Sequence, residues 1–104
     1  MYMSTEIPIE SLVVQRVQTG IRVEKRILKV LKAIAEYHDM TLSDLLEGIV
    51  LHVFEGKTPF SKPTLEHIAE FKRIYGLDLG ATASHQLTEA PGSSGRKSRK
   101  GKKP

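Results

Sequence analysis

The sequence has no cysteine. It also has no tryptophan, so side chains large enough to fill much of a core are few. Without cysteine, disulfide bonds, thiolate catalysis and cysteine-based zinc or iron–sulfur sites are excluded. No apolar run approaches the roughly 18 residues that a membrane-spanning helix needs, and residues 1–6 lack the basic start of a signal peptide. Because 104 residues give room for one domain at most, we expect a small cytoplasmic protein without a membrane partner.

Groupings of catalytic residues are also lacking. No Ser/His/Asp grouping, glycine-rich phosphate loop or pair of carboxylates stands out. The four histidines, His38, His52, His67 and His85, have no second histidine three or four residues away and no cysteine to complete a metal site. The sequence therefore predicts no enzyme activity, no cofactor and no metal site.

The net charge of +4 is unevenly distributed along the chain. Residues 96–103 hold six cations and no acid, and outside them 10 Lys and Arg face 12 Asp and Glu. Between residues 12 and 40, six cations face three acids, so a DNA-binding surface is expected there and in the tail. The tail cations, which would add non-specific affinity for nucleic acid unless they serve only solubility, are Arg96, Lys97, Arg99, Lys100, Lys102 and Lys103.

Alternating polarity over residues 16–23 (RVQTGIRV) predicts a short strand. The even positions are polar or bare, and the odd positions are apolar or β-branched. That alternation is typical of a strand with one buried face. A lone strand cannot satisfy its backbone donors and acceptors, and the chain offers no second strand nearby.

After this strand the apolar period changes to three and four residues. Apolar positions over residues 23–35 predict an amphipathic helix of about four turns. Thr41 is a good N-cap for a second helix, whose apolar stripe covers residues 42–53. Gly56 follows the last apolar position of that stripe, where a left-handed residue is expected to end the helix.

A third apolar stripe, over residues 65–75, suggests another helix that ends at Gly76. Residues 90–104 are almost entirely Gly, Ser, Pro, Lys and Arg, a composition that cannot bury enough apolar surface to become ordered. The expected organisation is a flexible lead-in over residues 1–13, a strand-helix-helix unit over 14–56, a linker and third helix over 57–80, and a disordered basic tail over 81–104.

The order strand, four-turn helix, short turn and Thr-capped helix resembles the ribbon-helix-helix family of Arc- and MetJ-like repressors. The resemblance rests on residues 17–23, the helix through residues 35–36, and residues 40–46 (MTLSDLL), and it covers about 40 of the 104 residues. It implies a mainly α ribbon-helix-helix fold: an intertwined homodimer with a two-stranded antiparallel ribbon, here with a third C-terminal helix and a disordered tail. A unit of about 40 residues is too small to hold a stable core alone, which explains the need for a second copy.

The resemblance also implies double-stranded DNA as a partner, with the ribbon placed in the major groove. Gln can bond adenine, and Arg can bond guanine, through two hydrogen bonds. The start of the second helix would hold a phosphate through its unpaired N–H groups. By the family's pattern, the base-reading positions are Gln18, Gly20 and Arg22, and the phosphate-contacting positions are Arg16, Thr41, Leu42 and Ser43.

Two glycines stand out against this pattern. Gly20 lies at the centre of the expected reading face, where the family usually places a side chain that contacts a base. It would permit close approach of the backbone to DNA, or else indicate a ribbon that reads little sequence. Gly48 lies inside the second helix, at a cost of about 1 kcal/mol relative to alanine, which suggests close helix packing in a dimer core.

Three hypotheses for function follow. The first is a homodimeric, sequence-specific DNA-binding transcription regulator of the repressor kind. The second is a protein-interaction module, such as an antitoxin or a plasmid-partition component, that binds its partner through residues 64–79. An exposed apolar face on those residues would favour the second hypothesis, whereas packing on the core would favour a structural role for them. The third, a monomeric helix-turn-helix with its turn at residues 37–40, leaves the alternation of residues 16–23 unexplained.

Overall fold

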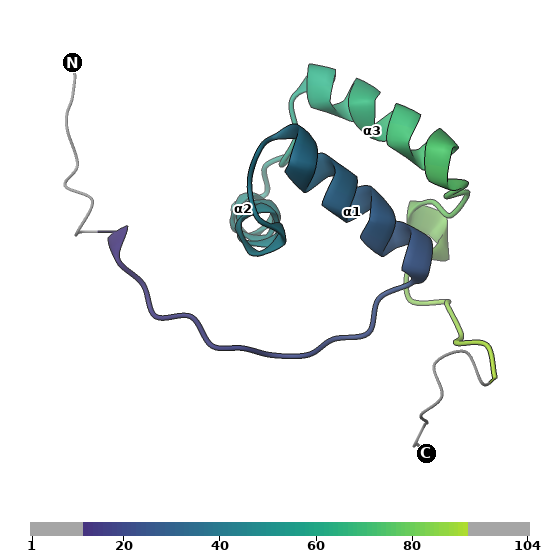
Figure 1. The fold of residues 1–104 in the computed structure, drawn as a ribbon, viewed down its shortest axis with the longest axis horizontal. Coiled ribbons are helices and arrows are strands. Elements are labelled where there is room, and N and C mark those ends of the chain that lie inside the picture. Colours follow the sequence, from purple (N-terminus) through teal and green to yellow (C-terminus); the bar gives the residue numbers. More distant parts are fainter. Residues whose placement is uncertain (1–11, 92–104) are drawn as a thin grey trace.

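The computed structural model describes residues 12–91, which form three α-helices and no strand. These are α1 (Lys25–Tyr37), α2 (Leu42–Phe54) and α3 (Lys62–Tyr75), followed by a turn of 3-10 helix, η2 (Ala81–Ala83). The helix α1 packs against both of the others, and Figure 1 shows α3 running alongside it while α2 crosses at a steep angle. The prediction of a mainly α protein with three helices is confirmed.

Each helix begins at a side chain that accepts hydrogen bonds from the first turn. Glu24 caps α1 and accepts from the N–H groups two and three residues further on, at 2.8 and 3.0 Å. Thr41 caps α2 at 3.1 Å, as predicted, and Ser61 caps α3 at 3.4 Å. Because these bonds satisfy otherwise unpaired donors, the sequence sets all three starting points locally.

The three helices also end in the same way, with a residue of positive φ. These residues are Asp39 (59°), Gly56 (72°) and Gly76 (67°). The N–H of the next residue then donates to the carbonyl five residues earlier, at 2.8 or 2.9 Å in each case. This arrangement is typical of helix ends in which the left-handed residue is glycine or a short polar residue. The two glycine ends were predicted correctly.

The buried core is small and centres on α1. Its buried apolar side chains, each 3–5% exposed, are Val30, Ile34 and Ala35 of α1 and Leu45 of α2. The only other buried side chain in the described part is Thr64 of α3, whose hydroxyl lies 3.2 Å from His38 Nε2. Half-buried side chains surround this cluster, from Leu31, Leu42, Ile49, Phe60, Ile68, Phe71 and Leu77. Four buried apolar side chains are few for 80 described residues.

Two apolar surfaces remain uncovered. The first belongs to residues 13–23, which we name the strap, where Val13, Val14, Val17 and Ile21 are 65–82% exposed. The second is the C-terminal half of α2, where the exposed side chains are Val50, Leu51, Val53 and Phe54. Soluble monomers rarely expose so much neighbouring apolar surface. Both surfaces therefore lack the covering that such residues require.

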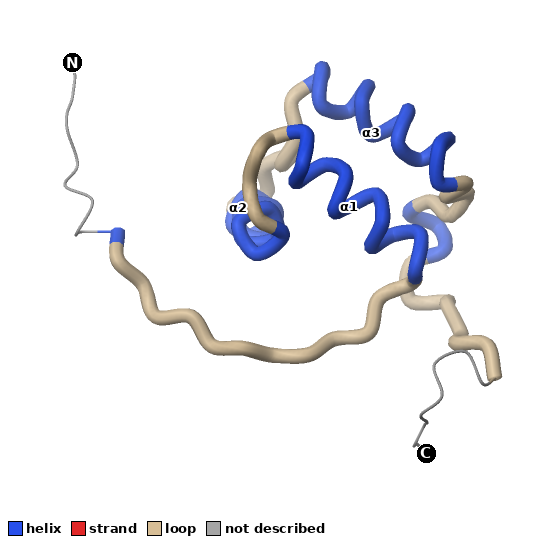
Figure 2. The backbone as a smooth tube through the Cα atoms, in the orientation of Figure 1, coloured by secondary structure: helices blue, strands red, loops and turns tan. Residues whose placement is uncertain are grey.

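The strap is where the structure differs from the sequence prediction. We expected a strand over residues 16–23, but the strap has no regular secondary structure and runs as a long arc before α1 (Figure 2). A strand exists only where a neighbouring strand accepts and donates its backbone hydrogen bonds, and none of the described residues supplies one. In addition, the tail that we expected to begin at residue 81 includes η2, and Glu89 makes side-chain hydrogen bonds.

Replacing Ile34 with alanine is expected to lower the free energy of unfolding by about 2–5 kcal/mol, because its side chain is 3% exposed in the centre of the core. Ile74→Ala is the matched control, since it removes the same atoms from a side chain that is 70% exposed. Urea unfolding at one fixed protein concentration measures both losses. Equal losses would show that the core is wrongly assigned.

Candidate nucleic-acid interface

Arg16 ties the strap to α2. Its Nε donates to Glu47 Oε2 at 2.7 Å, and its Nη2 donates to Glu47 Oε1 at 2.6 Å. The same Nη2 lies 3.8 Å from Asp44 in the first turn of α2. This two-point contact brings Arg16 to the N-terminal end of α2, which Thr41 caps. Arg16 and the start of α2, which were both expected to contact phosphate, therefore lie in one region.

The contact between Arg16 and Glu47 shifts both pKa values in the direction that keeps the pair charged. The hydrogen bond from Arg16 is the largest effect and lowers the pKa of Glu47; burial opposes it, and the charge of Arg16 adds a smaller lowering. The hydrogen bond to Glu47 likewise raises the pKa of Arg16. Both side chains are about half exposed, so solvent screens the attraction and the pair stabilises the strap only weakly.

Arg22, at the other end of the strap, contacts the segment that follows α3. Its Nε donates to Glu89 Oε1 at 3.0 Å, and its Nη2 donates to Glu89 Oε2. Hydrogen bonding to Glu89 is the largest cause of the raised pKa of Arg22. The two arginines expected to contact DNA are therefore each held by a carboxylate of the same chain.

A network at the start of α1 explains why the last segment lies near Arg22. Arg26 donates to Glu24 Oε2 at 2.9 Å, to the Gly76 carbonyl at 3.0 Å, and to Asp78 Oδ1 at 3.0 Å. Burial is the largest single effect on Glu24 and raises its pKa. The hydrogen bonds from the Ile27 N–H and from Arg26 together outweigh burial, so the pKa of Glu24 is lowered overall. The end of α3 is thereby fastened to the start of α1.

The remaining strap positions lie between these two arginines. Gln18 is exposed and makes no hydrogen bond to another residue in the range 12–91. Gly20 has no positive φ, and a side chain there would meet nothing within 4 Å. Neither its backbone conformation nor its surroundings in this single chain therefore require glycine. The surroundings of Gly48 in α2 do not require glycine either, because nothing lies within 4 Å of a Cβ added there.

At the start of α2, Thr41 and Ser43 are exposed and Leu42 is half-buried against the core. Their backbone N–H groups lie at the positive, N-terminal end of the helix dipole, which favours an anion. The acids Asp44 and Glu47 follow directly, and Arg16 offsets part of their charge. The tail cations from Arg96 to Lys103 lie outside the described residues.

Sequence reasoning missed the acidic partners, Glu47 and Glu89. Glu47 stands on the helix that carries the expected phosphate contacts, so an acid there was a visible signal of local compensation. Glu89 stands in the expected tail, 67 residues from Arg22, and no periodicity or spacing connects the two. Only the folded chain brings them together.

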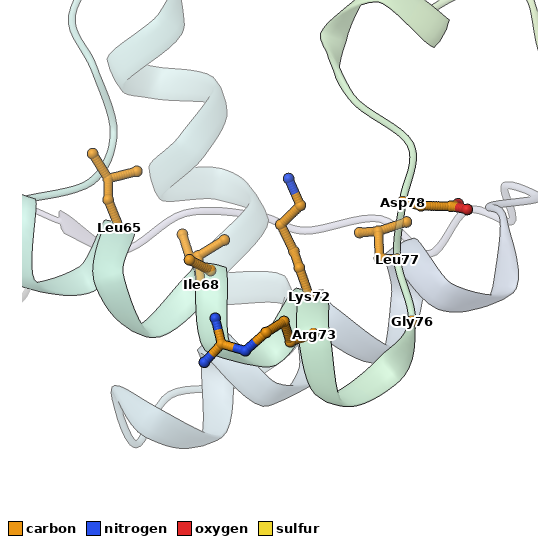
Figure 3. Close-up of a pocket in the computed structure, with 8 residues that line it drawn as sticks. Leu65, Ile68, Lys72, Arg73, Gly76, Leu77 and Asp78 are labelled. Carbon is orange, nitrogen blue, oxygen red and sulfur yellow. The ribbon is translucent and has the colours of Figure 1, made fainter.

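The third helix packs on the core and leaves a shallow groove beside that contact. Ile68, Phe71 and the following Leu77 pack against the buried cluster, and Ile68 and Leu77 also line the groove. Figure 3 shows the groove, where Lys72 and Arg73 project beside apolar side chains. Its lining residues are Leu65, Ile68, Ala69, Lys72, Arg73, Gly76, Leu77 and Asp78.

Metal-binding side chains do not gather in groups of three anywhere between residues 12 and 91. Three of the histidines have neighbours of their own: His38 contacts Thr64, His52 contacts the Gly48 carbonyl at 2.7 Å, and His67 contacts Glu70 at 3.3 Å. None of the helices in this range is long and apolar enough to cross a membrane.

No family model, curated protein or solved structure shows significant similarity to this chain. The assignment of function therefore depends on the residues and contacts described above.

Replacing Glu47 with glutamine is expected to loosen the strap, because the charge that holds Arg16 is removed. The backbone order parameters of residues 13–23, measured by ¹⁵N relaxation, should decrease. Glu66→Gln, which removes an exposed acid from α3, is the matched control and should leave these order parameters unchanged. Unchanged order parameters in both variants would contradict a role of Glu47 in holding the strap.

The same contact should depend on pH. The pKa of Glu47 is lowered from its ordinary value of 4.5, so the contact is fully present above that pH and is lost as the pH falls through the lowered pKa. Order parameters of the strap should therefore be constant from about pH 7 to 5 and decrease at more acidic pH. The decrease attributable to Glu47 should be absent from the Glu47→Gln protein.

Proposed function

We propose that this protein is a homodimeric DNA-binding transcription regulator in which the straps of two chains pair into an antiparallel ribbon. The observation that carries the proposal is the strap itself. Its alternating sequence is that of a half-buried strand, while four of its apolar side chains, those of Val13, Val14, Val17 and Ile21, are 65–82% exposed. A second copy supplies what is missing, because two identical strands pair antiparallel about a two-fold axis.

Pairing of the straps would give each apolar surface a cover. Side chains alternate along a strand, so Val17, Ile21 and Val23 share one face. Two such faces, together with the exposed C-terminal halves of two α2 helices, supply apolar surface for a core shared between the chains. The small core of the single chain supports a shared core in a dimer. Four buried apolar side chains give little stabilisation, so contacts with a second chain would have to supply more.

The opposite face of the ribbon would carry Arg16, Gln18 and Arg22 from both chains. A two-stranded ribbon fits the major groove, where arginine and glutamine pair with guanine and adenine. The N–H groups of residues 41–43, which the helix leaves without a partner in its first turn, would hold phosphates on either side and fix the register of the dimer. Two-fold symmetry of the protein calls for a palindromic or repeated DNA site.

The DNA-binding proposal is tested by Arg22→Ala. The matched control is Arg73→Ala, which removes the same side chain from an exposed position on α3. The probe is a duplex of about 25 base pairs, selected from a random pool by the full-length protein, which is long enough for two half-sites. Loss of one guanine contact should weaken binding by about 1–3 kcal/mol for each copy. Fluorescence anisotropy titrations measure the affinities.

Arg22→Ala should weaken binding of the selected duplex much more than Arg73→Ala does, while both variants keep the mass and helix content of the original. If the random pool yields no enriched duplex, or if both variants bind it as tightly as the original protein, the proposal is wrong.

A second candidate function is a protein-interaction module that uses α3. It is favoured by the groove on α3 and by Leu65, which is 51% exposed at its edge (Figure 3). It ranks second because Phe71 and Ile68 already place one side of α3 on the core, which favours a structural role. The variant Leu65→Glu separates the two functions. If the protein is the DNA-binding regulator proposed above, this variant keeps the affinity of the original protein for the selected duplex.

A further inference from the structure

The segment after α3 returns to the DNA-reading end of the strap. Arg26 donates to the Gly76 carbonyl and to Asp78, which fastens the exit of α3 to the start of α1. Figure 1 shows the following residues passing below the start of α1, where the strap ends. Glu89 thereby reaches Arg22, and both residues of this pair come from one chain, so the contact is available to each subunit of a dimer.

The contact uses the N–H groups of Arg22 that a base contact needs. Glu89 accepts from both Nε and Nη2, which form one side of the guanidinium fork. The same fork geometry serves arginine for the two acceptors of guanine and for a phosphate. While the carboxylate holds both donors, Arg22 cannot present that side of its fork to DNA.

We propose that Glu89 competes with DNA for Arg22, so that the C-terminal segment over residues 84–91 has to release this arginine when the reading face binds a duplex. This inference rests on the proposed function. A dimer contains two such contacts, and both have to open for symmetric binding.

The contact of Arg16 with Glu47 differs in its consequences. Glu47 stands on α2, and its contact holds the strap within the strand-helix-helix unit. Glu89 stands outside that unit, and every residue from 84 to 91 is exposed. Releasing Glu89 from Arg22 therefore disturbs no core packing, and what these two residues lose is one half-exposed ion pair in each chain. Such a contact lowers the affinity for DNA by a modest factor without preventing binding.

The test measures the affinity of the full-length protein for the selected duplex with and without the carboxylate. Glu89→Gln keeps the shape of the side chain and removes its charge. Glu66→Gln makes the same chemical change at an exposed position of α3 and so measures the effect of charge alone. The two changes are also combined with Arg22→Ala, so that the dependence on this arginine is measured directly.

Glu89→Gln should tighten binding about three- to fivefold relative to Glu66→Gln, and this gain should vanish when Arg22 is alanine. Equal affinities of the two single variants, or a gain that persists without Arg22, would overturn the competition. Failure of the proposed function is seen separately, because Arg22→Ala alone would then leave the affinity for the duplex unchanged.

Discussion

A β-strand needs a neighbour to satisfy its backbone hydrogen bonds, and the strap has no such neighbour among residues 12–91 of its own chain. The rest of the molecule reflects this constraint. The core contains four buried apolar side chains, and the strap and the end of α2 leave their apolar side chains exposed. Under the proposed function, one event removes both deficits, because pairing of two straps supplies the backbone partners and brings two sets of exposed apolar side chains together.

The same constraint shapes the distribution of charge. The strap joins α1 at a network of Glu24, Arg26 and Asp78, and its two arginines contact Glu47 and Glu89. The carboxylates that contact the arginines of the strap lie on two parts of the chain, with Asp44 and Glu47 on α2 and Glu89 after η2. Each arginine that we propose to contact DNA is thus kept in an ion pair in the free chain, and Glu47 and Glu89 have different consequences. One holds the strap near α2, and the other competes for the reading face under our proposal.

The helices could be predicted from the sequence because their limits depend on neighbouring residues. Thr41 caps α2 from within its own first turn, and Gly56 and Gly76 adopt the left-handed conformation that ends a helix. The strap could be recognised by its alternation, yet a strand there would need a neighbouring strand that the described part of the chain does not supply. The pair of Arg22 and Glu89 could not be predicted at all, because 67 residues separate them and only the packing of α3 on α1 brings them together.

Sedimentation equilibrium of the full-length protein tests the central claim most directly, since the account depends on a second copy of the chain. The measurement is made over a range of micromolar concentrations, with circular dichroism on the same samples. The account predicts a mainly helical species with twice the chain mass of 11.6 kDa. A folded species of 11.6 kDa at all concentrations would contradict it, and the paired ribbon and the base-reading role of Arg22 would then both be wrong.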